Sequence, residues 1–189
     1  MSPIIRFCER KSVPMLFIHT GQHYTYSMDR IFFQELKLPE PTRHLDIGSH
    51  SHGKQTGLLL TGLEEALQEE KPGIVLVQGD TNTVLAGGLA ASKLSIPVGH
   101  VEAGLRSYDR TMPEEINRVL VDHLSSFLFV PTENAKRLLL KEGISEDNIF
   151  ITGNTIVDAV NENKRLSMGK SGVLEQFGLK KGEYFLVTL

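Results

Sequence analysis

Short apolar segments alternate with longer amphipathic segments along most of this chain. The short segments are rich in Val, Ile, Leu and Phe. A brief continuous apolar run of this kind is typical of a strand covered on both faces of a parallel sheet. The expected strands are residues 15–19, 74–77, 97–101, 127–130 and 149–152.

The longer segments have the apolar spacing of helices. Leu59, Leu63 and Leu67 recur at intervals of four residues and predict one buried helix face. In the next helix, Gly87 and Gly88 allow close packing against the sheet because they carry no side chain. The expected helices are residues 27–36, capped by Ser27, 54–70 and 83–94, one opened by Pro113, and one capped by Thr132 that ends near Gly143.

This order of elements predicts an α/β fold, a Rossmann-like parallel sheet with right-handed crossovers and helices on both faces. Residues 1–166 form the expected domain. Residues 167–182 are rich in Gly and Lys and predict a linker, and residues 184–189 predict the first strand of a second domain. The chain opens inside an expected helix and stops in an expected strand, so we expect an N-terminal fragment whose opening strand is missing. The alternative is a complete single domain with an edge helix.

Composition restricts the classes of protein and partner. The 189 residues carry a formal net charge of −3 without a basic excess, which argues against a nucleic-acid platform. No apolar run approaches a membrane span, and no signal peptide is recognisable. The single cysteine excludes a disulfide within the chain. We expect a cytoplasmic protein with neither a membrane nor a nucleic-acid partner.

Carboxylates follow two successive strands of the expected sheet. Asp80 and Glu102 each lie just beyond a strand, and ligands of open parallel sheets bind outside the carboxyl ends of the strands. Glu114 follows on a loop-to-helix turn that could bring it to the same crevice. Asp80 could instead cap its helix, and Glu114 and Glu115 could be structural acids of a first helical turn. Glu102 has no capping role, which favours function.

The basic residues leave two interpretations open. Arg106, Arg110 and Arg118 could hold a phosphate or pair with the nearby acids. His100 is expected to be a buried histidine with satisfied hydrogen bonds. The chain has neither a Walker loop nor a G-x-G-x-x-G motif, and His50 and His52 lack a third metal ligand, so no cofactor or metal is expected.

Five motifs, in order along the whole chain, resemble those of the UDP-N-acetylglucosamine 2-epimerase family. They are T-G-Q-H at residues 20–23, V-x-G-D-T at 77–81, H-V-E-A-G-L-R at 100–106, P-E-E-x-N-R at 113–118 and T-G-N-T-x-x-D at 152–158. The resemblance implies two Rossmann-like domains in a GT-B-like arrangement with the active site between them. It also implies that a G-T-R-P-E strand, a catalytic histidine after Leu189 and the uridine-binding domain lie outside this sequence.

The resemblance further implies the site and the reaction. Asp80, Glu102 and Glu114 would be catalytic, and Asp80, Glu102, Gln22 and Arg106 would bind a UDP-sugar without a cofactor or metal. The family interconverts UDP-N-acetylglucosamine and UDP-N-acetylmannosamine by eliminating and re-adding UDP, for surface polysaccharide synthesis, and the intact protein is expected to be a homodimer. The alternatives are a hydrolysing epimerase that releases N-acetylmannosamine, a GT-B transferase half-domain, or an inactive fragment.

Overall fold

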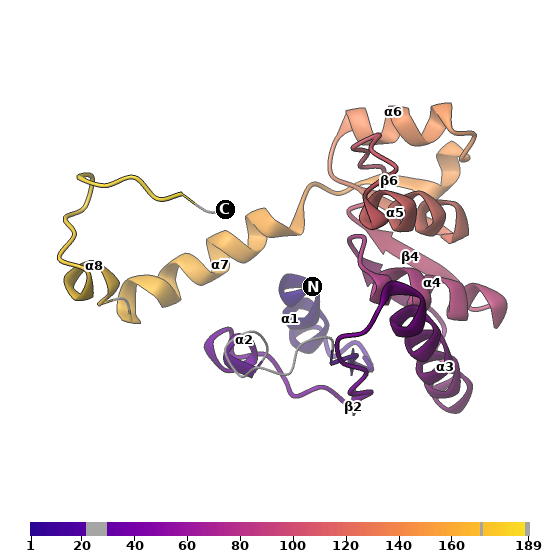
Figure 1. The fold of residues 1–189 in the computed structure, drawn as a ribbon, viewed down its shortest axis with the longest axis horizontal. Coiled ribbons are helices and arrows are strands. Elements are labelled where there is room, and N and C mark those ends of the chain that lie inside the picture. The colour runs from indigo at the N-terminus through magenta and orange to yellow at the C-terminus, as the bar shows by residue number, and fades with distance from the viewer. Residues whose placement is uncertain (22–29, 171, 188–189) are drawn as a thin grey trace.

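The strands form two parallel sheets in a computed structural model that describes residues 1–21, 30–170 and 172–187 (Figure 1). The larger sheet has the order β3-β4-β5-β6, and every neighbouring pair is parallel. The smaller sheet pairs β1 with β2. The strands are β1 (Ile18–His19), β2 (Arg43–His44), β3 (Val75–Gln78), β4 (Val98–Val101), β5 (Phe127–Val130) and β6 (Ile149–Ile151).

Helices follow the strands as the sequence predicts, so the α/β class with parallel sheets flanked by helices is confirmed. Pro113 is the first residue of α5, and the Thr132 hydroxyl accepts a hydrogen bond from the Ala135 N–H to cap α6. Ser27 lies outside the described residues. The helices are α1 (Ser2–Arg10), α2 (Arg30–Glu35), α3 (His52–Glu70), α4 (Asn82–Lys93), α5 (Pro113–Leu124), α6 (Glu133–Lys141), α7 (Thr155–Lys170) and α8 (Val173–Gln176).

The main core lies where α3, α4 and α5 meet β3 and β4. Leu59 and Leu63 of α3 pack there with Val98 of β4 and Val121 of α5. At Gly87 a side-chain Cβ would lie 3.2 Å from a methyl group of Val77, so the glycine allows the close approach of helix to strand that the sequence predicts. This tightly packed layer holds the carboxyl ends of β3 and β4 in place.

A cavity of about 810 Å³ separates the free edge of β3 from β1. Apolar side chains of α1 and residues 13–18 line it together with β3. Ile74, just before β3, is 44% exposed, and Leu76 of β3 is 36% exposed. The expected strand over residues 15–19 is shorter than predicted, because only Ile18 and His19 pair with a neighbour among the described residues. The edge of β3 that faces this cavity therefore pairs with no strand of the described residues.

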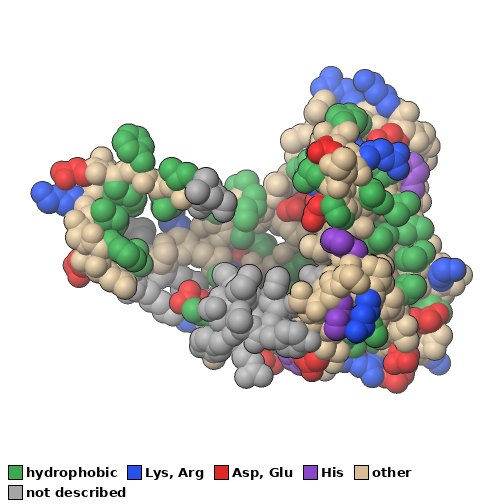
Figure 2. Space-filling model, viewed as in Figure 1, with side chains coloured by type: hydrophobic (Ala, Val, Ile, Leu, Met, Phe, Trp, Pro, Cys, Tyr) green, Lys and Arg blue, Asp and Glu red, His purple; other side chains and the backbone are tan. Residues whose placement is uncertain are grey.

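The C-terminal part differs from the sequence prediction. Helix α7 runs to Lys170, so the expected domain boundary at residues 166 and 167 falls within a helix, and α8 occupies part of the expected linker. Residues 184–187 are not a strand, because no described segment pairs with them. Phe185 is fully exposed, and apolar side chains lie open over this extension (Figure 2). Its assignment to a second domain stays a prediction.

Helix α7 leaves the sheet and packs beside α1 (Figure 1). Arg6 of α1 forms an ion pair with Glu162 of α7 at 2.7 Å. Among the described residues, no helix is both long enough and apolar enough to cross a membrane.

Candidate active site

Asp80 and Glu102 lie at the same edge of the sheet, just beyond the carboxyl ends of the neighbouring parallel strands β3 and β4. This confirms the placement predicted from the sequence. Asp80 is not the cap of α4, because Thr81 occupies that position. Both carboxylates are partly buried. Open α/β sheets bind their ligands outside the carboxyl ends of the strands, which is where these two residues lie.

Helix α5 holds Asp80 in place. The guanidinium of Arg118 forms an ion pair with the Asp80 carboxylate. The side-chain amide of Asn117 donates to the Asp80 carbonyl oxygen at 2.9 Å. The last two residues of the P-E-E-x-N-R motif therefore fix both the side chain and the backbone of Asp80.

Glu102 has an unusual backbone conformation, with a φ of 70° in the left-handed region. A residue with a side chain is strained there, and such strain is often found at functional sites. Its carboxylate accepts a hydrogen bond from Gln78 Nε2 at 2.9 Å, and the same amide donates to Thr155 Oγ1 at 3.0 Å. Gln78 thus links Glu102 to the start of α7, where the T-G-N-T motif lies.

Glu114 and Glu115 lie in the first turn of α5 but differ in their surroundings. Glu115 is buried and accepts hydrogen bonds from the backbone N–H groups of Ser107 and Tyr108, so it stabilises the loop after β4. Glu114 is partly exposed and precedes Arg118 by four residues. Residues four apart share a helix face, so Glu114 lies on the same face of α5 as Arg118, which forms an ion pair with Asp80.

The ionisation of Glu115 depends on competing effects. Burial raises the pKa of the Glu115 carboxyl. Hydrogen bonds from Ser107 and Tyr108, together with the charge of Arg118, lower that pKa by more, so the net pKa lies below its ordinary value. Glu115 is therefore a charged structural residue, the alternative that the sequence left open.

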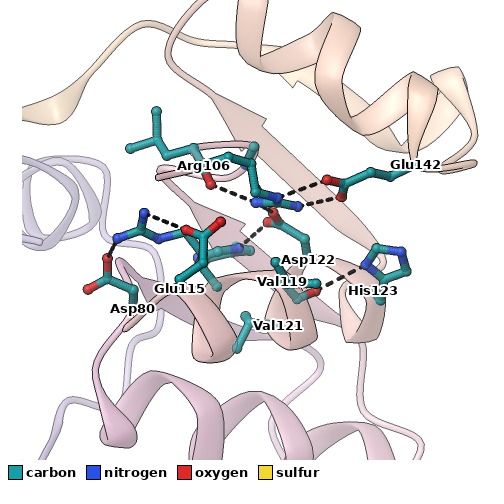
Figure 3. A network of polar contacts seen from close by, with 12 residues as sticks. Asp80, Arg106, Glu115, Val119, Val121, Asp122, His123 and Glu142 are labelled. Carbon is teal, nitrogen blue, oxygen red and sulfur yellow. Dashed lines mark hydrogen bonds and ion pairs between the residues drawn. The ribbon is translucent and has the colours of Figure 1, made fainter. Parts of the chain in front are cut away.

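Arg106 has no surface to offer a ligand, because its side chain is 1% exposed. Its guanidinium bonds Asp122 at 2.7 Å and Glu142 at 2.5 Å (Figure 3). Burial lowers the pKa of Arg106, but the two carboxylates raise it by more, and the guanidinium stays charged. In this structure Arg106 thus binds two carboxylates, and its expected role in substrate binding stays a prediction. Arg110 is exposed, and no ion pair joins it to another described residue.

Sequence reasoning missed three polar residues around the two acids, Gln78, Asn117 and Thr155. Asn117 and Thr155 belong to the motifs at residues 113–118 and 152–158, so the sequence did contain a signal that could have identified them. Gln78 is the last residue of β3 and carried none. Gln22, expected to bind substrate, lies outside the described residues. Within the described chain, no group of three or more His, Cys, Asp or Glu side chains could hold a metal ion.

A sequence model of the UDP-N-acetylglucosamine 2-epimerase family matches residues 6–189. The chain belongs to this family. It is 57% identical over its whole length to the UDP-N-acetylglucosamine 2-epimerase of Methanocaldococcus jannaschii, of which the match covers 52%. It is also 50% identical over 135 residues, 71% of its length, to the UDP-2,3-diacetamido-2,3-dideoxy-D-glucuronate 2-epimerase of Pseudomonas aeruginosa, of which the match covers 38%.

Solved structures of the family share the fold. The crystal structure of the M. jannaschii UDP-GlcNAc 2-epimerase in complex with UDP-GlcNAc and UDP superposes with a TM-score of 0.90 at 59% identity. The superposition covers 94% of this chain and 49% of that one. The UDP-GlcNAc 2-epimerase of Neisseria meningitidis, bound to UDP-GlcNAc, gives a TM-score of 0.81 at 34% identity, covering 94% of this chain and 47% of that one. The chain thus spans about half the length of these family members.

Proposed function

We propose that the protein contributes the acid–base groups of an enzyme that epimerises UDP-N-acetylglucosamine at C2 to UDP-N-acetylmannosamine. The observation that carries this proposal is the position of Asp80 and Glu102 at the carboxyl ends of two adjacent parallel strands. Each carboxylate has its own positioning partner, Arg118 for Asp80 and Gln78 for Glu102. Membership of the epimerase family supports the reaction class.

The chemistry explains why several carboxylates are needed. In the first half-reaction a base takes the C2 proton, the C1–O bond to UDP breaks, and UDP leaves with the electron pair to give a 2-acetamidoglucal. In the second half-reaction a UDP oxygen attacks C1 while an acid delivers a proton to the opposite face of C2. Proton-transfer groups are therefore required on both faces of the sugar.

The described residues suit this requirement. Asp80 and Glu102 follow neighbouring strands of the sheet, and Glu114 lies in the first turn of α5. The positive end of that helix also favours an anionic group nearby. Arg106 and Arg118 are already paired with carboxylates, which leaves the exposed Arg110 as the described arginine in the loop after β4 that could meet a diphosphate.

The reaction class is tested with a chimera, in which this chain replaces the matching residues of the M. jannaschii relative. Incubated with UDP-N-acetylglucosamine in D₂O, the chimera should form UDP-N-acetylmannosamine that carries deuterium at C2, as followed by NMR. A product that keeps its original C2 hydrogen would exclude elimination. Release of free N-acetylmannosamine would instead establish the hydrolysing alternative.

A second substrate follows from the match to the P. aeruginosa epimerase of a diacetamido glucuronate. That compound is also a UDP-sugar, and the named reaction is again a 2-epimerisation. We propose that the same acids would serve either substrate, since the reacting carbon is the same. Comparing kcat/KM of the chimera for the two UDP-sugars decides between them. The homodimer, cytoplasmic location and surface polysaccharide role implied by the resemblance belong to this proposal.

A further inference from the structure

His100 lies on β4, two residues before Glu102, and its side chain is fully buried. One ring nitrogen lies 2.6 Å from the Asp122 carboxylate, and the other lies 2.8 Å from the carbonyl oxygen of Gly79. We propose that His100 is a positioning residue, which fixes the peptide between Gly79 and Asp80 and thereby orients the Asp80 carboxylate. The proposal deepens the proposed function, on which its catalytic part rests.

Both ring nitrogens face acceptors. A peptide carbonyl can only accept, so Nε2–H of His100 donates to Gly79. The Oδ2 atom of Asp122 accepts from the Arg106 guanidinium at 2.7 Å and from the Gly104 N–H at 3.2 Å, as expected of an ionised carboxylate. Nδ1–H of His100 therefore donates to Oδ1 of Asp122. The ring thus carries a proton on each nitrogen.

The charges of this buried group balance. With a proton on each ring nitrogen, His100 adds one positive charge to that of Arg106, and Asp122 and Glu142 supply two negative charges. Asp122 lies between the two cations and bonds both. A buried charge without a partner is strongly unfavourable, so each member holds the others in one arrangement. The His100 ring cannot turn without breaking a charged hydrogen bond.

This arrangement fixes Gly79 on both sides of its Cα. The Gly79 N–H donates to the carbonyl oxygen of Val101 at 3.1 Å, and the Gly79 carbonyl accepts from His100. Gly79 has a φ of +83°, which only glycine adopts readily, so the chain turns sharply here. Two hydrogen bonds from β4 therefore fix the backbone position at which Asp80 follows Gly79.

Two substitutions separate this role from a general contribution to folding. In His100→Gln the amide nitrogen lies as many bonds from Cα as Nε2, so the Gly79 contact is kept and the Asp122 contact is lost. In His100→Asn the amide nitrogen replaces Nδ1, so the Asp122 contact is kept and the Gly79 contact is lost. Each variant loses one of the two hydrogen bonds of the histidine. If His100 only stabilised the fold, the two variants would therefore affect the Gly79 backbone equally.

The experiment is NMR on this chain, with no activity required. Wild-type His100 should show an N–H signal for each ring nitrogen. Exchange of the Gly79 amide should become faster by about tenfold in His100→Asn and stay near the wild-type rate in His100→Gln, since only the former frees the turn to open. A single ring N–H in the wild-type chain would overturn the proposal even if neither variant folds. Equal Gly79 exchange in the two folded variants would overturn it as well.

The same pair in the chimera tests the catalytic part. His100→Asn should lower kcat by about a hundredfold, the effect of misplacing a group by roughly 1 Å, with little change in KM. His100→Gln should retain most of kcat. Equal Gly79 amide exchange in His100→Asn and His100→Gln would refute the positioning of Asp80. If the two exchange rates differ as expected but the wild-type chimera is inactive, only the proposed function is refuted.

Discussion

Arg118 of α5 forms an ion pair with Asp80, the carboxylate that directly follows β3. The same guanidinium bonds Glu115 at 3.0 Å. One cation therefore joins an acid of the proposed site to a buried acid of the helix that frames it. The contact joins the motifs at residues 77–81 and 113–118 in space.

Arg118→Gln should destabilise the chain and impair the chimera. The substitution leaves Asp80 and the buried Glu115 without their cation, a loss of about 1–3 kcal/mol in the free energy of unfolding. Denaturant unfolding measures this loss. Lys136→Gln is the matched control because it breaks an ion pair with the exposed Glu146, and it should leave stability unchanged. Equal effects of the two substitutions would contradict the role given to Arg118.

The stability of the chain should fall in acid partly through Glu115. Its pKa is lower in the folded chain than in the unfolded chain, so the folded state gains stability above the unfolded pKa of about 4.3. That stability is lost as the pH falls through the folded pKa. Glu115→Gln should be less stable at pH 7 and lose less stability between pH 5 and pH 3. Unfolding curves at several pH values test this, and parallel losses would contradict it.

The cavity beside β3 predicts self-association. The edge of β3 that pairs with no described strand and the apolar side chains around it form a surface on which another strand can add. Light scattering should show association that increases with concentration. An apolar strand of about five or six residues, joined before Met1, should suppress it, because Met1 contacts Gln78 at the carboxyl end of β3. A prolyl-substituted copy of that strand is the control, and equal suppression would argue against strand pairing.

The isolated 189 residues should not epimerise UDP-N-acetylglucosamine. The chain spans about half of the relatives that it matches, so a ligand held between two domains would lose the contacts of one of them. Loss of positioning alone can add roughly 7–11 kcal/mol to a barrier. NMR of the nucleotide sugar follows the product. Turnover within tenfold of the chimera would show that these residues hold a complete site.

The sequence predicted the parts of the fold that local patterns determine. The apolar runs of β3 to β6, Pro113 at the start of α5 and the Thr132 cap each depend on a few neighbouring residues. The prediction was weaker where a strand depends on distant partners. Residues 184–187 have strand-like composition but pair with no other described segment, and residues 15–17 border a cavity.

The candidate site shows the same division. Asp80 and Glu102 could be placed from the sequence because the ends of adjacent parallel strands meet at one edge. The roles of the arginines could not be predicted from the sequence, because their partners are distant in the chain. Arg106 bonds Glu142, 36 residues away, and Arg118 bonds Asp80, 38 residues away. Gln78 was missed because a polar residue that ends a strand has no local signature.

The central claim is that Asp80, Glu102 and Glu114 carry the proton transfers at C2. The most direct measurement is the kcat of the chimera after Asp80→Asn, Glu102→Gln and Glu114→Gln, with Asp147→Asn as the control. Asp147 is an exposed acid just before β6, at the opposite edge of the sheet. Each of the three substitutions should lower kcat by about two to four orders of magnitude, the usual contribution of an acid–base group, while the control stays near wild type. A kcat within a few-fold of the control for Asp80→Asn or Glu102→Gln, in a folded chimera, would contradict the account.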